Sequence, residues 1–190
     1  MGQRSAGQKK GVPFGILNMM TGAVMILFGT SAETSDFWVD CLEYWWEKTK
    51  EKCQRMRRLV IRLDNGPSSA SHRTQFLKRL VEFAQRTGLE IHLVYYPPYH
   101  SKYNPIERVW GILEKHWNGT LLTDLGVAMG WASTMTWNEQ HPEVVHLDRD
   151  YRKGVKVSKA DMVQVNAHLH RSSTLPKWDV IIKPSLLPCG

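Results

Sequence analysis

Two acidic residues stand where a carboxylate side chain can take part in chemistry. Asp64 follows the apolar stretch 59–63 and directly precedes Asn65-Gly66, which places it at the end of an expected strand. Open α/β sheets bind their ligands beyond the carboxyl ends of their strands. Glu107 stands just inside the helix that is expected after the next strand. Carboxylate oxygens in two consecutive β-α units suit Mg²⁺ or Mn²⁺, and a pair of such ions can activate an attacking oxygen and stabilise a leaving one.

The local sequence around each acid also has a purely structural explanation. Residues 64–67 read Asp-Asn-Gly-Pro, and these residue types are common in turns because Asp and Asn bond their own backbone and Gly accepts positive φ. Residues 104–107 read Asn-Pro-Ile-Glu, which fits a helix start with Glu at the third position, as in a capping box. Spacing alone favours turn and capping chemistry over a metal site.

The apolar periodicity predicts alternating strands and helices up to residue 118. Two apolar runs on either side of Thr21-Gly22 predict a β-hairpin, and Thr34 is expected to cap a helix. Gly88 is expected to stop a later helix. The expected ranges are 14–18 and 23–28 for the hairpin, then 35–55 (helix), 59–64 (strand), 76–88 (helix), 90–96 (strand) and 105–117 (helix). The order β-β-α-β-α-β-α predicts an α/β fold in which helices flank a mixed sheet.

The patterns are weaker beyond residue 118. We expect a helix within 121–137, a second helix from Ser158 to about His170, and a late edge strand over 178–182. This part of the chain is therefore expected to form a mostly helical C-terminal extension.

Composition excludes several classes of protein. Of the 190 residues, 42% are hydrophobic and 23% are charged, which excludes a disordered chain. The longest apolar run, 23–28, is too short to span a bilayer, and the basic, polar start is no secretory signal, so no membrane partner is expected. Three cysteines without a CxxC pair suit a reduced cytosol better than a disulfide scaffold. The net charge of +7 is typical of a protein with a polyanionic partner.

Much of the positive charge lies between residues 48 and 62. This basic cluster contains one acid, Glu51, and seven cations: Lys48, Lys50, Lys52, Arg55, Arg57, Arg58 and Arg62. It fits a surface that contacts phosphates, and it fits equally a solvated helix end, where cations are stabilised by the helix dipole.

The two stretches that contain the acids resemble the second and third catalytic blocks of DDE transposases. Residues 63–67 read LDNGP, with His72 shortly after them, and residues 96–107 read YPPYHSKYNPIE. The resemblance is to bacterial insertion-sequence enzymes of the mariner-related lineage, in particular the ISAzo-type group. Residues 12–40 and 174–179 are similar to that group as well, so the resemblance covers most of the chain.

The resemblance implies an RNase H-like fold and two linked reactions on DNA. A metal-activated water cuts a phosphodiester, and the freed 3′-hydroxyl then attacks target DNA. Asp64 matches the second acid of the family and Glu107 the third, and both are expected to bind Mg²⁺ or Mn²⁺.

The resemblance also implies supporting residues and partners. Asn65 and Asn104 match flanking positions and are expected to orient the acids or the backbone, with His72 as a further supporting residue. The implied partner is DNA, both transposon ends and target, in the bacterial cytoplasm and on the nucleoid, and a homo-oligomer is possible. The expected DNA-binding residues are Lys102, Arg108, Arg55, Arg57 and Arg58.

The chain departs from the family pattern at its start. The first acid of the family lies on a strand upstream of the hairpin, whereas residues 1–11 contain no acid, and Asp36 and Asp40 fall on the first helix instead. We therefore expect a transposase fragment that lacks the first strand and is inactive alone, divided into a basic tail (1–11), a partial RNase H-like core (12–118) and the C-terminal extension (119–190). Two alternatives stay open: a non-catalytic DNA-binding or oligomerisation remnant, and an unrelated metal-dependent phosphoesterase.

Overall fold

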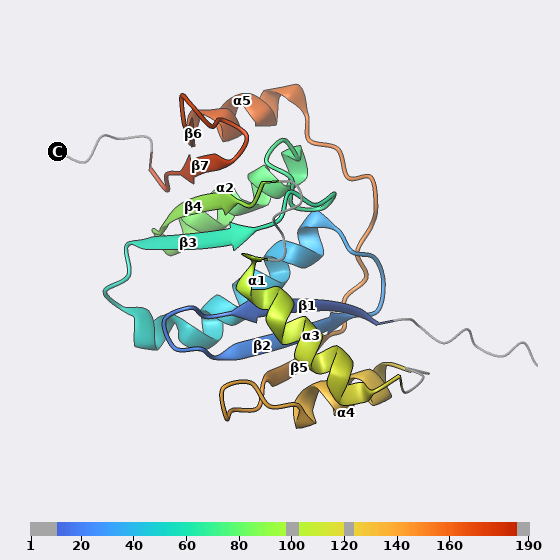
Figure 1. The fold of residues 1–190 in the computed structure, drawn as a ribbon. Coiled ribbons are helices and arrows are strands. Elements are labelled where there is room, and N and C mark those ends of the chain that lie inside the picture. The colour runs from blue at the N-terminus through green and yellow to red at the C-terminus, as the bar shows by residue number, and fades with distance from the viewer. Residues whose placement is uncertain (1–10, 98–102, 120–123, 186–190) are drawn as a thin grey trace, which may run out of the picture. The chain divides into compact units, whose positions relative to one another are not determined.

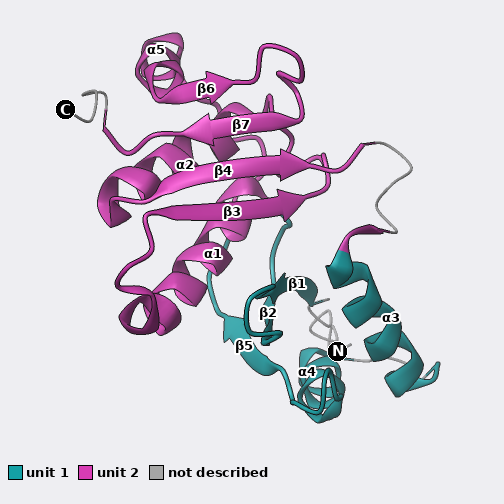
Figure 2. Ribbon diagram, turned by 60° about the vertical axis from the view of Figure 1, so that its left-hand side comes forward, with its two compact units in different colours: residues 1–33, 105–151 teal, residues 34–104, 152–190 magenta. Residues whose placement is uncertain are grey.

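The computed structural model describes residues 11–97, 103–119 and 124–185, and the chain forms two compact units. Unit 1 comprises residues 1–33 and 105–151, and unit 2 comprises residues 34–104 and 152–190 (Figure 2). Each unit thus combines a part of the expected core with a part of the expected C-terminal extension. No helix among the described residues is long and apolar enough to cross a membrane.

Unit 1 is a three-stranded mixed sheet with two helices. The strands β1 (Val12–Leu17), β2 (Val24–Gly29) and β5 (Glu143–Leu147) follow in the order β1-β2-β5; β1 pairs with β2 antiparallel, and β2 pairs with β5 parallel. The helices are α3 (Pro105–Trp117) and α4 (Leu125–Thr134). Every residue of the inner strand β2 is buried, as expected for a strand of five consecutive apolar residues.

The core of unit 1 joins β2 to both helices. Its buried members are Val24, Ile26, Phe28, Val109, Leu113, Ala128, Ala132 and Met135. Gly15 on β1 is needed for this packing, because a Cβ at that position would lie 2.5 Å from Cζ2 of Trp110. Only a residue without a side chain lets α3 approach β1 this closely.

Unit 2 is a four-stranded mixed sheet in the order β3-β4-β7-β6. Its elements, labelled in Figure 1, are α1 (Ser35–Thr49), the 3₁₀ turn η1 (Lys50–Cys53), β3 (Arg58–Leu63), α2 (Thr74–Thr87), β4 (Glu90–Tyr95), α5 (Lys159–Ala167), β6 (Leu169–Arg171) and β7 (Asp179–Ile182). The strands β3 and β4 are parallel, whereas β7 is antiparallel to both β4 and β6. Helices α1 and α2 lie on the same face of this sheet (Figure 2).

The expected α/β fold class is confirmed, with the mixed sheet present as two sheets. Thr34 caps α1, since its Oγ1 accepts a hydrogen bond from the Phe37 amide at 3.2 Å, and Gly88 ends α2 with a left-handed φ of 72°. The helix from Ser158 ends at Ala167, and His170 belongs to β6 instead.

The late strand was expected at an edge, and this was wrong. The strand β7 lies between β4 and β6, and its residues Val180 and Ile182 are fully buried. Its four residues alternate between half-buried and buried, a pattern that an edge strand and a short inner strand share. The strand β5 was not expected at all, because its partner β2 is more than one hundred residues away in the sequence.

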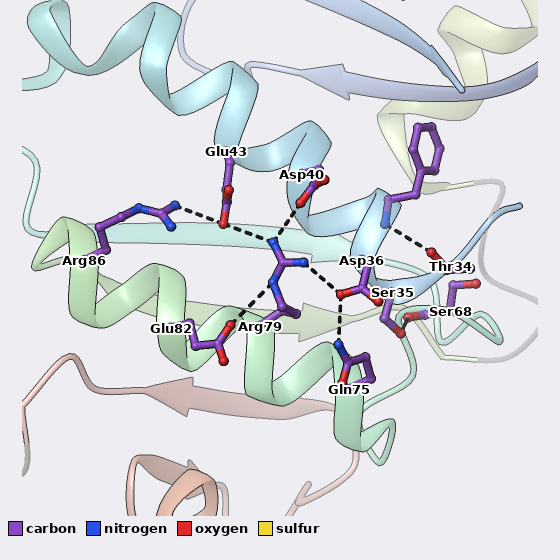
Figure 3. A network of polar contacts seen from close by, with 11 residues as sticks. Thr34, Ser35, Asp36, Asp40, Glu43, Ser68, Gln75, Arg79, Glu82 and Arg86 are labelled. Carbon is purple, nitrogen blue, oxygen red and sulfur yellow. Dashed lines mark hydrogen bonds and ion pairs between the residues drawn. The ribbon is translucent and has the colours of Figure 1, made fainter. Parts of the chain in front are cut away.

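A cluster of charged side chains joins α1 to α2 in unit 2 (Figure 3). The Arg79 guanidinium on α2 is 2.8 Å from Asp36 Oδ1, 2.7 Å from Asp40 Oδ1 and 3.3 Å from Glu43 Oε1. These three acids lie on one face of α1 at helical spacing. Asp36 also accepts a hydrogen bond from Gln75 Nε2 at 2.8 Å. Asp36 and Asp40, together with Glu43, are therefore engaged in holding α1 against α2.

The ion cluster keeps Arg79 charged although its side chain is only 16% exposed. Burial by itself disfavours the charged guanidinium, but the hydrogen bonds to Asp40 and Asp36 and the charges of Asp40 and Glu43 outweigh it and raise the pKa of Arg79 above its usual range. Removing this cation would deprive Asp40 of its ion pair with Arg79, and would leave Asp36 with Gln75 and Glu43 with Arg86.

We predict that Arg79→Met lowers the free energy of unfolding by about 2 kcal/mol, because a partly buried ion cluster loses its central cation. The matched control is Arg86→Met on the same helix, whose guanidinium is 53% exposed and contacts Glu43 at 3.0 Å. Exposed ion pairs contribute little, so the control should change stability by less than about 1 kcal/mol. Urea unfolding measures both, and equal effects of the two variants would contradict the central role of Arg79.

Candidate functional site

Asp64 directly follows β3, an edge strand of the four-stranded sheet in the described part of the chain. Leu63 before it is buried, and Asp64 itself is half-buried. Its Oδ1 atom is buried and has no hydrogen-bond partner among the described residues. A buried carboxylate oxygen without a hydrogen-bond donor costs free energy, so Asp64 Oδ1 is a position where a bound ion or a water molecule can complete the bonding.

The strand β3 presents cations on the same side as Asp64. Side chains alternate along a strand, so Arg58, Val60 and Arg62 share a face with Asp64, and all three are exposed. The alternate residues Leu59, Ile61 and Leu63 are more buried. Arg62, two residues before Asp64, is the cation of this face that lies nearest to Asp64 in the sequence, where it could contact a phosphate.

Hydrogen bonds between its own residues fix the conformation of the turn that follows Asp64. Ser69 Oγ donates to the Asp64 carbonyl oxygen at 3.3 Å, and the Ser71 amide donates to Asn65 Oδ1 at 3.1 Å. Asn65, the residue directly after Asp64, therefore fixes the backbone of this turn through its side chain. Its part in orienting a metal-binding acid stays a prediction.

Side chains from two other elements hold the carbonyls of the same turn. Ser35 Oγ at the start of α1 donates to the Ser68 carbonyl oxygen at 2.7 Å (Figure 3), and the Tyr95 hydroxyl on β4 donates to the Ser69 carbonyl oxygen at 2.8 Å. Burial raises the pKa of the Tyr95 hydroxyl, which keeps it a donor at neutral pH. Sequence reasoning missed both residues, because a Ser at a helix start and an apolar-patterned Tyr on a strand give no signal of their partner.

Glu107 lies in the first turn of α3 and is exposed. It belongs to unit 1, whereas Asp64 belongs to unit 2. The expectation that both acids bind Mg²⁺ or Mn²⁺ therefore stays a prediction. Arg108 beside Glu107 is exposed as well.

The other expected site residues differ in their surroundings. Asn104 is buried, with 7% of its surface exposed, and His72 is exposed in the turn before α2. Lys102 lies outside the described residues. Their supporting and DNA-contacting roles stay predictions.

The residues of the basic cluster lie at the end of α1, on η1, in the turn after it and on β3, and all seven cations are exposed. Arg58 forms an ion pair with Glu90 of β4, Lys50 forms one with Glu47, and Arg57 Nη1 makes long contacts of 3.4 and 3.5 Å to backbone carbonyls. Arg55 is exposed. The cluster thus presents several cations to solvent on unit 2, as both a phosphate-binding surface and a solvated helix end require.

A hard divalent cation prefers carboxylate oxygens as its ligands. Asp64 Oδ1, which is buried and accepts no hydrogen bond from the described residues, is such an oxygen. Among the described residues, no group of three or more His, Cys, Asp or Glu side chains is arranged to hold a metal ion. Asp64 would therefore be one ligand of an ion whose remaining ligands come from elsewhere.

Comparison with known families gives one match. The family model described as "Rhodopirellula transposase DDE domain" matches residues 3–184 of the chain, which is nearly its whole length. No curated protein and no solved structure matches the chain.

We predict that Asp64→Asn leaves the free energy of unfolding unchanged or raises it by about 1 kcal/mol, because the substitution removes a buried charge that has no donor at Oδ1. Asp36→Asn is the matched control, because Asp36 accepts bonds from Arg79 and Gln75. It should lower stability by about 1–3 kcal/mol. Thermal and urea unfolding measure both, and a clear loss of stability in Asp64→Asn would show that its carboxylate supports the fold.

Proposed function

Because the chain belongs to the DDE transposase domain family, whose members act on DNA in transposition, we propose that Asp64 and Glu107 are two of the acids of a DNA strand-cleavage and strand-transfer site. The observation that carries this proposal is the buried, unpartnered Oδ1 of Asp64 in the stretch LDNGP, inside the range that the family model matches. An unrelated phosphoesterase is excluded by the family match.

The acids would hold Mg²⁺ or Mn²⁺ through their carboxylate oxygens. When bound, such an ion supplies Lewis-acid stabilisation of charge on phosphate oxygens and lowers the pKa of coordinated water. The protein contributes a carboxylate on a turn whose carbonyls are held by Ser35 and Tyr95. A fixed turn keeps Asp64 in place without loss of side-chain and backbone entropy when the ion binds.

The cations near the acids would hold the DNA backbone. Arg62 and Arg58 share the face of β3 that leads to Asp64, and Arg108 is next to Glu107. Lys102, Arg55 and Arg57 extend the proposed set. Such contacts position the phosphodiester but carry no base specificity. We further propose that the chain binds transposon ends and target DNA and assembles into a homo-oligomer.

A second proposal follows from the absence of acids in residues 1–11. The matched motifs of residues 1–190 supply two acids, Asp64 and Glu107, and two carboxylates hold Mg²⁺ weakly because this ion gives up its waters reluctantly. We therefore propose that these 190 residues by themselves bind DNA and a divalent ion but do not cleave DNA at a useful rate.

We predict weak Mn²⁺ binding by the wild-type chain, detected as loss of the free-ion signal in electron paramagnetic resonance. Asp64→Asn and Glu107→Gln should each weaken it about tenfold, because each removes a charged ligand. The matched control is Glu114→Gln, an exposed acid on the same helix as Glu107, which should bind as the wild type does.

The same proteins are then assayed for nicking of a supercoiled plasmid that carries the DNA flanking the reading frame, with Mg²⁺ or Mn²⁺. The expected result is no cleavage above background by the wild type. Metal-dependent nicking that disappears in Glu107→Gln would refute the proposed inactivity and would support Glu107 as an acid of the cleavage site. Mn²⁺ binding unchanged in both acid variants would refute the site itself.

We predict salt-dependent binding of random duplex DNA through the basic cluster. Each neutralised phosphate contributes about −0.9 to the slope of log K against log salt, so the double variant Arg55→Gln/Arg57→Gln should flatten the slope by up to about 1.8. Arg86→Gln, an exposed cation on α2 outside the cluster, is the control. Fluorescence anisotropy at several salt concentrations measures the slope, and an equal slope in all three proteins would exclude the cluster from DNA binding.

A further inference from the structure

In the turn that follows Asp64 (residues 65–71), three backbone carbonyl oxygens accept hydrogen bonds from side chains of three different elements. Besides the bonds from Ser35 to Ser68 and from Tyr95 to Ser69, Arg171 Nη2 donates to the Ser71 carbonyl oxygen at 2.6 Å. Arg171 lies on β6, one hundred residues after Ser71. It is the one charged donor of the three, and charge-assisted hydrogen bonds are stronger than neutral ones.

The guanidinium of Arg171 is fixed at two points. Its Nη1 donates to the Pro176 carbonyl oxygen at 2.9 Å, in the connection between β6 and β7, while Nη2 reaches Ser71. A planar guanidinium bound at two atoms has a defined orientation, which a flexible ammonium group does not provide. Because β6 pairs with β7, and β7 with β4, this anchor belongs to the same sheet as β3.

The contacts continue from Arg171 to Asp64 through the backbone. Ser71 is held at both of its polar groups: its carbonyl by Arg171 and its amide by Asn65 Oδ1 at 3.1 Å. Asn65 is the residue directly after Asp64. Ser71 is only 2% exposed, whereas Arg171, which donates to its carbonyl, is an exposed residue.

The charge of Arg171 also acts on the neighbouring donor. Burial raises the pKa of the Tyr95 hydroxyl, and the positive charge of Arg171 opposes that shift. The two donors to the turn therefore lie close enough for their electrostatics to interact.

We propose that Arg171 is a positioning residue for the metal-binding carboxylate: through Ser71 and Asn65 it fixes the turn that presents Asp64. This inference rests on the proposed function, because it assigns to Asp64 the role of a metal ligand. It gives the β6 strand, far from both catalytic motifs in sequence, a part in the site. Groups that orient a ligand without touching the metal typically change metal affinity 10- to 100-fold when they are removed.

The test compares Mn²⁺ binding by Arg171→Met, Arg171→Lys, Tyr95→Phe, Asp64→Asn and the wild-type chain. We expect Arg171→Met to weaken Asp64-dependent binding about tenfold. Arg171→Lys should recover part of the affinity, because an ammonium reaches one carbonyl but not both. Lys177→Met is the matched control, an exposed cation in the same β6–β7 connection, and it should bind as the wild type does.

A second readout separates positioning from general stability. Hydrogen exchange of the Ser71 amide should become about tenfold faster in Arg171→Met, while amides of β4 keep their protection, since only the turn is released. If Arg171→Met does not fold, Arg171→Lys and Tyr95→Phe are measured in the same way, and both should show faster exchange at the turn and weaker Mn²⁺ binding.

The possible results separate the positioning role of Arg171 from the proposed function of Asp64. Loss of Mn²⁺ binding in Asp64→Asn together with wild-type binding in the folded Arg171 variants would overturn the positioning role and leave the proposed function intact. Unchanged binding in Asp64→Asn would overturn the proposed metal site, and the positioning role with it. Equal loss of protection throughout unit 2 would show that Arg171 merely supports the fold.

Discussion

The half-buried guanidinium of Arg79 is the contact on which the arrangement of unit 2 depends. Three carboxylates of α1 stand on one helix face, and without a cation they would repel one another at the surface of α2. With Arg79 between them they hold α1 in one position. That position matters beyond packing, because Ser35, beside Asp36 at the start of α1, donates to the Ser68 carbonyl of the turn behind Asp64. Helix α1 therefore carries both the acids that contact Arg79 and the Ser35 side chain that bonds to Ser68 (Figure 3).

The turn that carries Asp64 combines strong support with one unmet bond. The carbonyls of the turn are held from α1, β4 and β6, and its amide at Ser71 is held by Asn65. Against this background the buried, unpartnered Oδ1 of Asp64 stands out. In the described part of the chain, Glu90 Oε1 and Trp137 Nε1 are also buried without a hydrogen-bond partner, but Asp64 Oδ1 differs in directly following a strand, on a turn whose other polar groups are bonded. This contrast favours a ligand-binding acid over ordinary turn chemistry.

The two acids of the matched motifs belong to different compact units. Asp64 follows a strand of unit 2, whereas Glu107 starts a helix of unit 1 that packs against β1. Each unit supplies its own acid and its own exposed cations, Arg62 in one and Arg108 in the other. Helix α3 contacts β1 within unit 1, and the turn that follows Asp64 is held by hydrogen bonds within unit 2.

The sequence by itself determined the local elements and the candidate acids. Apolar periodicity, the Thr34 cap and the Gly88 stop gave the helices and strands up to α3, because such signals act over a few residues. The motifs around Asp64 and Glu107 indicated the family that the family model confirms. Only the tertiary structure decided what depends on distant partners: β5 beside β2, β7 inside its sheet, the acids of α1 around Arg79, and Arg171 on the Ser71 carbonyl. The physical reason is that a hydrogen bond or a strand pairing across one hundred residues leaves no periodic trace in either segment, since any exposed Arg or short apolar run has the same local pattern.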